Sequence, residues 1–265
     1  SLTFNATGTN FTFNPAGPYT IPANSSYELS FTLAVPETEG PYNGQIILTQ
    51  TYPEPGAEVT VQVTGTIVPA GLVAIGTGTN TALNLPIYAY YGYNYSQSIY
   101  LQSDIQLTGS WLIKKLYYFW DGAYPGTNSK DWTVYMGNTS KTVFTNTSDF
   151  VPLTQLTPVF SGTVNLPQVS GGCWVEINLN PYFSYTGQNL VVAVHENTPG
   201  YDSSYGHFYC TSSTNVSVHY YRDASDINLT NPMDGSPNNS VKAGYPNVKM
   251  IFSEIPPEPV FTITP

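Results

Sequence analysis

The chain has 265 residues, which fits two domains and leaves ample length to bury a core. Only 9% of the residues are charged, against about 25% in an average soluble domain, and the formal net charge is −10. This acidic balance argues against nucleic acid as a partner, because phosphate binding needs clustered Lys or Arg. No apolar run approaches the roughly 20 residues that a bilayer span needs, so we predict no membrane insertion.

Residues 1–70 are predicted to form a small immunoglobulin-like β-sandwich. Short alternating strands are separated by turn residues at intervals of about 8 to 12 positions, and no helical period interrupts them. Further along, Val59, Val61 and Val63 alternate with polar residues in the same way. The clearest alternation, over Tyr27–Val35, places five apolar side chains on one face: Tyr27, Leu29, Phe31, Leu33 and Val35.

Three runs in this domain are similar to the immunoglobulin-like modules that repeat in large secreted bacterial proteins: Ile21–Phe31, Gly40–Ile47 and Val59–Ile67. One departure is visible at Gln50–Pro53, where those modules often carry an Asn-Asp turn. The resemblance therefore implies the fold and leaves the subfamily open.

Residues 71–254 are predicted to form a larger β-sandwich of the jelly-roll type, with eight or more strands. Pro and Gly recur throughout this stretch, and no segment has a 3.6-residue period. After the opening segment, strands are expected at seven places: Trp111–Trp120, Trp132–Met136, Val159–Leu166, Cys173–Leu179, Asn189–Glu196, Val216–Tyr221 and Val248–Phe252.

The larger domain carries two unusual runs, Gly-x-Gly-Thr at Gly76–Thr79 and Tyr-Tyr-Gly-Tyr-x-Tyr-Ser-Gln at Tyr90–Gln97. With these runs it resembles a β-sandwich module of secreted, multidomain surface proteins from Bacteroidetes-type bacteria. The similarity continues in order through four further runs: Val134–Ser140, Trp174–Ile177, Pro181–Tyr185 and Asn189–Val192. The resemblance implies a non-catalytic surface module and does not imply a ligand.

Residues 255–265 are predicted to be a proline-rich joint followed by a donor β-strand. If Ser1–Phe4 is placed directly after Pro265, the alternation of apolar residues continues without a phase slip. In the immunoglobulin-like modules the first strand commonly has an aromatic-x-Ile-x-Pro half followed by Ser-Leu-x-Phe, and Phe261–Pro265 and Ser1–Phe4 match these halves. The alternatives are a strand that folds back on its own chain or one cut from a longer chain. The predicted donor residues are Val260, Phe261, Thr262, Ile263 and Thr264.

Two cysteines, Cys173 and Cys210, predict a disulfide in a chain that looks secreted, with two buried free thiols as the alternative. The sequence also contains nine Asn-x-Ser/Thr sequons, which become glycan acceptors if the producing cell has the machinery. These candidate acceptors are Asn5, Asn10, Asn24, Asn94, Asn138, Asn146, Asn215, Asn228 and Asn238.

The one oxygen-rich cluster of the sequence consists of Asp223, Asp226, Asn228, Asn231 and Asp234, of which Asp223, Asp226, Asn228 and Asp234 are the candidate ligands. Oxygen ligands on a loop suit Ca²⁺, but the spacing is not that of an EF-hand, and Asp and Asn residues also make turns. We therefore keep this cluster as a calcium candidate and otherwise predict neither a metal nor a cofactor.

No catalytic constellation is apparent in the sequence. His195-Glu196 lacks the second His of a zinc-protease motif, and no Gly-x-Ser-x-Gly occurs, so we predict that the chain is not an enzyme. The tyrosines between positions 88 and 100 allow two interpretations. Exposed rings stack on sugars, whereas rings that alternate along a strand pack in a core or against another domain, and we favour packing.

These observations predict a structural subunit of an extracellular or cell-surface filament, assembled head-to-tail by β-strand donation, or one repeat of a giant adhesin. Copies of the chain itself would be the partners, with surface glycans as further partners. Any secretion signal would have been removed or would lie upstream. The alternative function is a non-catalytic carbohydrate-binding accessory module of a secreted enzyme.

Overall fold

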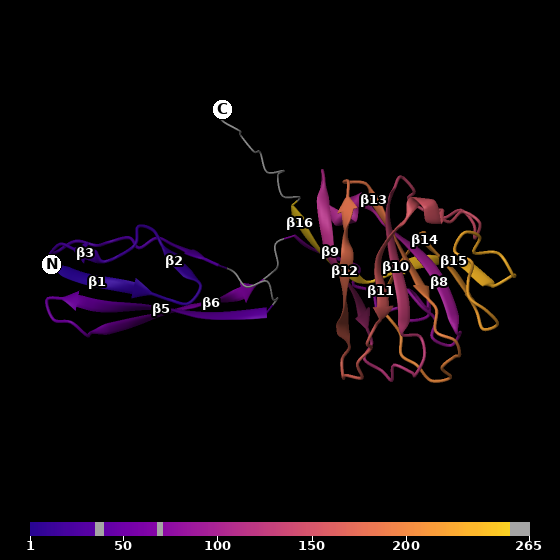
Figure 1. The fold of residues 1–265 in the computed structure, drawn as a ribbon, viewed down its shortest axis with the longest axis horizontal. Helices are drawn as coiled ribbons and strands as arrows, with labels where there is room; N and C mark the ends of the chain where they lie inside the picture. The colour runs from indigo at the N-terminus through magenta and orange to yellow at the C-terminus, as the bar shows by residue number, and fades with distance from the viewer. Residues whose placement is uncertain (35–39, 68–70, 255–265) are drawn as a thin grey trace, which may run out of the picture. The chain divides into compact units, whose positions relative to one another are not determined.

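The computed structural model describes residues 1–34, 40–67 and 71–254 (Figure 1). The chain divides into two compact units, Ser1–Pro69 and Ala70–Pro265, one residue away from the predicted boundary between residues 70 and 71. Apart from two single-turn helices, every regular element of the described residues is a β-strand. The predicted all-β fold is confirmed, and each unit is described below by itself.

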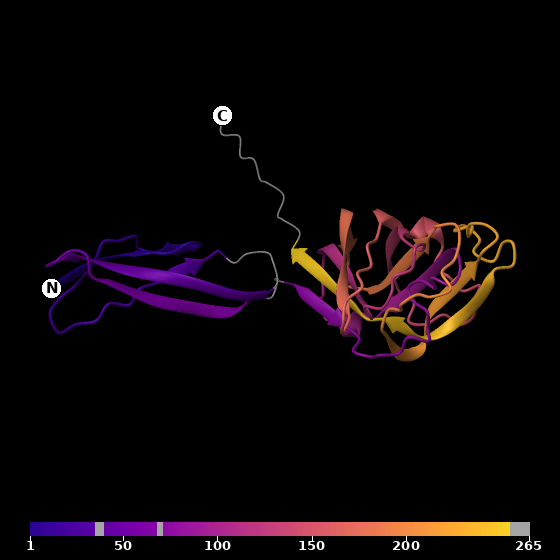
Figure 2. The same ribbon diagram turned by 90° about the horizontal axis from the view of Figure 1, so that it is seen from below.

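The N-terminal unit contains two antiparallel sheets of unequal size. The larger sheet has the strand order β3-β1-β5-β6, and the smaller one contains only β2 and β4. Strands β5 and β6 form one long hairpin (Figures 1 and 2). The strands are β1 (Leu2–Thr7), β2 (Phe11–Phe13), β3 (Tyr19–Ile21), β4 (Phe31–Leu33), β5 (Gly40–Tyr52) and β6 (Glu58–Ile67).

Strand β4 is shorter than the predicted strand Tyr27–Val35, whose last residue lies outside the described part of the chain. Its ladder with β2 runs from Phe11↔Leu33 to Phe13↔Phe31, and Asn14 N–H still donates to Ser30 O at 3.1 Å. The next residue along β2 is Pro15, which has no N–H to donate. The ladder therefore ends there, and Tyr27 lies outside any strand with its ring packed against Tyr19 at 5.3 Å.

The C-terminal unit is a sandwich of two antiparallel sheets. The six-stranded sheet has the order β11-β10-β13-β8-β14-β15, and the four-stranded sheet has the order β12-β9-β16-β7. The strands are β7 (Leu72–Ile75), β8 (Tyr93–Tyr100), β9 (Trp111–Trp120), β10 (Asp131–Thr139), β11 (Thr157–Thr163), β12 (Cys173–Tyr185), β13 (Asn189–Glu196), β14 (Cys210–Arg222), β15 (Asn238–Pro246) and β16 (Val248–Glu254). The two short helices are α1 (Gln102–Ile105) and η1 (Leu153–Gln155).

The main core lies between the two sheets of this unit. Trp132 on β10, Tyr118 on β9 and the loop residue Phe208 are almost fully buried, and their rings meet at centroid distances of 5.7 to 6.3 Å. Edge-to-face and tilted contacts of this kind add to the hydrophobic gain of burying large rings. This core gives the C-terminal unit a stability of its own.

A second apolar cluster covers the other face of the six-stranded sheet. Phe144 and Val151, from the segment between β10 and β11, pack there against β8, β13 and β14. The buried Gln97 on β8 fixes this segment, because its side chain both accepts from Val151 N–H at 2.7 Å and donates to Val151 O at 2.8 Å. A sheet covered on both faces explains why β8 and β13 are buried at almost every position.

The predicted disulfide is wrong, since Cys173 and Cys210 are both free thiols. Cys173 on β12 pairs with Trp120 on β9, and Phe208 bridges to Trp120 from the other side. The segment that carries Cys210 is thus two strand spacings, or roughly 9 to 10 Å, from Cys173. A disulfide needs Cα atoms within about 7 Å.

We expect thiol titration to distinguish the two cysteines. Without reductant, the denatured chain should give two thiols with Ellman's reagent. In the native chain Cys210 should stay unreactive, because it is fully buried and burial raises the pKa of its thiol to about 12. Cys173 is partly exposed and should react slowly. If the denatured, unreduced chain gives no thiols, Cys173 and Cys210 do form a disulfide and the structure is wrong at this point.

Candidate functional site

The described part of the N-terminal unit has too small a core for its length. Only four of its apolar side chains are buried: Phe4, Phe11, Tyr19 and Ile46. The described part of the C-terminal unit buries forty. Because a domain is stable only when it removes enough apolar surface from water, the N-terminal unit lacks cover for its larger sheet.

The part of the larger sheet that lacks cover is strand β6. Val61 pairs with Ile46 across the β5–β6 ladder, and Val59 pairs with Leu48, so the valines share the face of Ile46 that points to the core. Ile46 is 4% exposed, whereas Val61 is 43% and Val59 is 60% exposed. The core-facing side of β6 is therefore open to solvent at Val59 and Val61, and Val63 on the same face is half-buried. We call Val59, Val61 and Val63 the valine face.

Strand β6 also has an unpaired edge. It is the last strand of its sheet and pairs only with β5 within the described residues. Along these ten residues the backbone N–H and C=O groups of every second residue point away from β5, and such a row of groups is a template for a further strand. No proline interrupts β6, and its one charged residue is Glu58 at the start, so neither proline nor charge protects this edge along its length.

The smaller sheet leaves a further apolar side chain uncovered. Phe31 on β4 is 44% exposed, although it contacts Phe11 at 5.3 Å and Phe13 at 6.2 Å. An incomplete second sheet explains the exposure of both Phe31 and the valine face.

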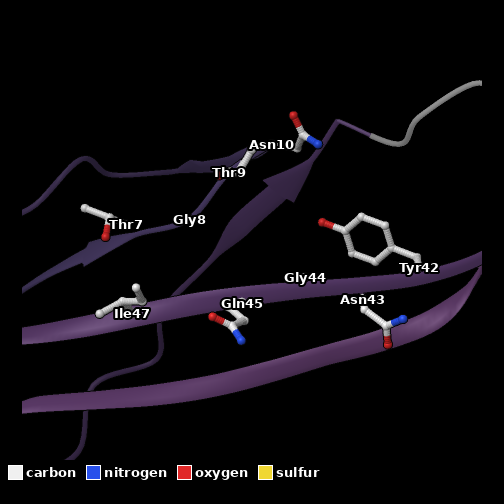
Figure 3. A pocket seen from close by; sticks show the side chains of 9 residues that line it. All are labelled: Thr7, Gly8, Thr9, Asn10, Tyr42, Asn43, Gly44, Gln45 and Ile47. Atoms are coloured by element: carbon white, nitrogen blue, oxygen red, sulfur yellow. The ribbon is translucent and has the colours of Figure 1, made fainter.

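A groove of about 640 Å³ opens beside β5 in the same unit (Figure 3). It exists because β1 pairs with β5 only from Ile47 onward, while β5 begins at Gly40. The ring of Tyr42 lies over Gly44, where an added Cβ would meet the tyrosine hydroxyl. The lining consists of Thr7, Gly8, Thr9, Asn10, Tyr42, Asn43, Gly44, Gln45 and Ile47, without an acid, a base or a thiolate. Such a groove suits a backbone segment and offers no catalytic chemistry.

The predicted donor residues cannot be placed against this site. Val260, Phe261, Thr262, Ile263 and Thr264 all lie outside the described residues. The sequence predicted that the donor completes the first strand, which the structure places as β1 between β3 and β5. The edge of β6 is a different acceptor. The sequence did not single out the valine face there, because alternation shows which side a residue faces and not whether that side is covered.

No family model, curated protein or solved structure matches this chain. Within residues 1–34, 40–67 and 71–254 no helix is long and apolar enough to cross a membrane.

The oxygen-rich cluster does not assemble a calcium site. Asp226 Oδ1 contacts His195 Nε2 at 2.6 Å, and Asp223 Oδ1 accepts from Gly92 N–H at 3.0 Å. Asn228 donates to Asp234 Oδ2 at 3.2 Å. The carboxylates point to different partners, and no group of three His, Cys, Asp or Glu side chains in the described chain can hold a metal ion.

His195 and Glu196 lie on opposite faces of β13 and do not form a joint site. The side chain of Glu196 is fully buried beside Asn94, which donates to its Oε2 at 3.3 Å, and burial raises the pKa of this carboxyl to about 7. Asn94 Oδ1 also contacts His219 Nε2 at 3.1 Å, and burial lowers the pKa of His219 to about 3. This buried network has no opening to solvent in the described structure, which gives it a structural role.

Eight of the nine sequon asparagines are exposed or half-exposed, and Asn94 is the exception. Its side chain is fully buried, accepts from Tyr88 N–H at 2.9 Å and donates to Tyr91 O at 3.0 Å. A glycan cannot be attached to this amide in the folded chain, so the prediction of an acceptor at Asn94 is wrong.

Proposed function

We propose that this chain is a structural subunit of an extracellular or cell-surface filament that assembles head-to-tail by β-strand donation. In this proposal, the segment 259–265 of one copy docks on the N-terminal unit of the next. If the chain is instead one repeat of a giant adhesin, the same strand comes from the preceding repeat of a continuous polypeptide.

The observation that carries the proposal is the valine face beside the edge of the ten-residue strand β6, which has no partner among the described residues. A strand that pairs with this edge makes backbone hydrogen bonds along the ladder, as in other cases of β-strand addition. The side chains at alternate positions of that strand become cross-strand neighbours of Val59, Val61 and Val63.

The C-terminal segment has the side-chain pattern that this face requires. Phe261 and Ile263 are two positions apart, as are the three valines, and both sets therefore follow the period of a β-strand. Full burial of a Phe or Ile side chain stabilises an association by about 1.5–3 kcal/mol each. Thr262 and Thr264 would then lie on the opposite face, where polar side chains are suitable.

Donation of this kind builds a polymer. The donor and acceptor are different surfaces of the chain, so the contact is heterologous and propagates unless the rotation between copies closes a ring. The sequence of residues 255–258 contains Pro256 and Pro257, which do not favour continuation of strand β16 into the donor segment.

The test is a charge on the valine face. We expect Val61→Lys to leave both units folded, because Val61 is 43% exposed in the single chain. It should lower the amount of polymer by about tenfold or more, since docking of the donor would bury an unpaired ammonium group. Polymer is measured by sedimentation and negative-stain electron microscopy, and folding by circular dichroism.

The matched control is Thr60→Lys, which places the same charge one residue earlier on the opposite face of β6. This variant should polymerise as the original chain does. Equal polymerisation of both variants, or equal loss in both, would show that the valine face is not the acceptor.

A further inference from the structure

Six tyrosines from three separate segments meet at one end of the C-terminal sandwich. The closest pair is Tyr91 and Tyr221, whose ring centroids are 4.5 Å apart, and the other contacts span 5.2 to 6.3 Å. They come from the loop before β8, the loop after β13 and the C-terminal end of strand β14. We call this set the tyrosine cluster: Tyr88, Tyr90, Tyr91, Tyr201, Tyr205 and Tyr221.

Two rings of the tyrosine cluster are exposed above the others. Tyr90 is 41% and Tyr201 is 58% exposed, and their centroids are 5.9 Å apart with an angle of 48° between the planes. The remaining four rings are half-buried and lie around them. By contrast, Tyr95 and Tyr100 on β8 are fully buried, as expected for rings that pack in a core.

The backbone that carries these two rings is held firmly. Asp202, next to Tyr201, accepts from Thr127 N–H at 2.8 Å and Asn128 N–H at 3.0 Å, and its own N–H donates to Ala89 O at 3.0 Å. The side chain of Asn128 donates to Tyr201 O at 3.0 Å. The ring pair is therefore a prearranged surface, and a ligand would not have to order a loose loop.

Glycine at two positions lets the two loops approach each other. An added Cβ on Gly92 would overlap the carbonyl oxygen of Gly200, and Gly200 has φ 98°, where glycine is favoured. Side chains at these positions would separate the loop of Tyr90 from the loop of Tyr201. The pairing of the two exposed rings thus depends on glycine at positions 92 and 200.

The imidazole rings of His207 and His219 pack on Tyr205 and Tyr221, each at a centroid distance of 5.0 Å, and no Lys or Arg of the described residues makes a cation–π contact with the tyrosine cluster. The three cation–π contacts of the described residues involve other rings: those of Tyr182, Phe144 and Trp174. Asp223 lies beside the tyrosine cluster, since one of its oxygens accepts from Gly92 N–H at 3.0 Å. The pKa of Tyr91 is raised chiefly by burial, with smaller contributions from Tyr221, Tyr88 and the charge of Asp223. The carboxylate of Asp223 offers a further acceptor for hydroxyl groups of a ligand.

We propose that Tyr90 and Tyr201 form a binding platform for neutral polysaccharides. A pyranose ring has an apolar C–H face, which stacks on an aromatic ring, and a rim of hydroxyl groups. Tyrosine offers both an apolar ring face and a hydroxyl group, so it matches both parts of such a ligand. An anionic polymer would meet the carboxylate of Asp223 beside these rings, which favours a neutral chain.

This function is separate from strand donation, because it uses residues of the C-terminal unit alone. A filament subunit with such a platform would present it once for every copy, and repetition would raise the avidity for a polysaccharide with repeated units. The platform remains testable on the single chain.

The experiment is native affinity electrophoresis of the full chain in gels that contain dextran, yeast mannan, laminarin or galactan. We expect at least one of these polysaccharides to retard the chain. Tyr90→Ala and Tyr201→Ala should each weaken the binding by about tenfold or more, as removal of an anchoring aromatic ring does at other interfaces.

The matched control is Tyr182→Ala, since Tyr182 is 53% exposed in the same unit and is not part of the tyrosine cluster. This variant should be retarded as the original chain is. Circular dichroism and urea unfolding of all three variants separate loss of binding from loss of fold. The proposal is overturned if no polysaccharide of the panel retards the chain, or if Tyr182→Ala loses binding to the same extent as the other two variants.

Discussion

Removal of residues 259–265 is expected to give a folded chain that no longer polymerises. All described strands of both units end at or before Glu254, so the deletion removes none of them. The valine face would remain on every copy, but no copy would carry Phe261 and Ile263 to cover it. Light scattering coupled to gel filtration should show only single chains of the truncated protein, whereas the complete chain should form polymers.

A synthetic peptide of residues 259–265 provides the control for this deletion. We expect the fluorescently labelled peptide to bind the truncated chain at a ratio of one to one, and a peptide with Phe261→Asp and Ile263→Asp to bind much more weakly, since it would bury two charges. Polymerisation of the truncated chain at the level of the complete chain would show that strand donation is wrong. Val61→Lys should also abolish peptide binding, which would show that the donor segment binds at the valine face.

Central strands were the easiest elements to predict from the sequence. Trp111–Trp120 and Asn189–Glu196 were predicted with the bounds that they have in the structure, as β9 and β13. Each lies between two other strands and is rich in large apolar or aromatic residues, so the pattern and the environment agree.

Edge strands were harder to predict. Strand β15, Asn238–Pro246, was missed because it lies at the edge of its sheet and contains few apolar residues. Strand β4 was predicted too long, because the alternation of Tyr27–Val35 says nothing about Pro15 on the partner strand. In both cases the neighbouring strand of the sheet decides whether a segment pairs and where the pairing ends. The local sequence pattern contains no information about that neighbour.

The candidate sites depend even more on contacts between distant segments. The sequence placed Val59 and Val61 on one face, but their exposure follows from the absence of an opposing strand. The exposed pair of Tyr90 and Tyr201 joins loops more than one hundred residues apart in the chain, and only the first of these loops has a tyrosine-rich sequence that draws attention to it. The same limit explains the disulfide error, because the separation of Cys173 from Cys210 is set by strand β9.

The second large effect is expected in the dependence of stability on pH, and it arises from Glu196 and His219. Burial raises the pKa of Glu196 from 4.5 to about 7 and lowers the pKa of His219 from 6.5 to about 3. Between about pH 4.5 and 7 the folded chain holds a proton on Glu196 that the unfolded chain has lost, so this residue lowers the free energy of unfolding as the pH rises. Between about pH 3 and 6.5 His219 is protonated in the unfolded chain and neutral in the folded chain. In this range His219 therefore increases the free energy of unfolding as the pH rises.

The two contributions oppose each other where their ranges overlap, from about pH 4.5 to 6.5. These two groups should therefore leave the stability nearly constant in that range and lower it on either side. Each pKa unit corresponds to about 1.4 kcal/mol, so the full effect of Glu196 is about 3 kcal/mol. Asp131 adds a small repulsion to Glu196, and Lys242 adds one to His219, so neither nearby charge reverses the direction of these shifts.

Glu196→Gln and His219→Gln separate the two contributions. In Glu196→Gln only the histidine remains, and the free energy of unfolding should rise from about pH 4.5 to 6.5 and then stay level. In His219→Gln only the carboxyl remains, and the free energy of unfolding should fall over the same range. Urea unfolding followed by tryptophan fluorescence measures this in the C-terminal unit alone, because all four tryptophans lie there: Trp111, Trp120, Trp132 and Trp174.

The difference between each variant and the original chain is the quantity to compare. Asp149 and Glu176 have pKa values that their hydrogen bonds lower, so they also reduce stability as the pH falls, but they do so equally in all three proteins. A parallel pH profile for Glu196→Gln and the original chain would mean that Glu196 is ionised in the folded state at pH 5. The network of Asn94, Glu196 and His219 would then need a donor to Glu196 beyond Asn94 and Thr198.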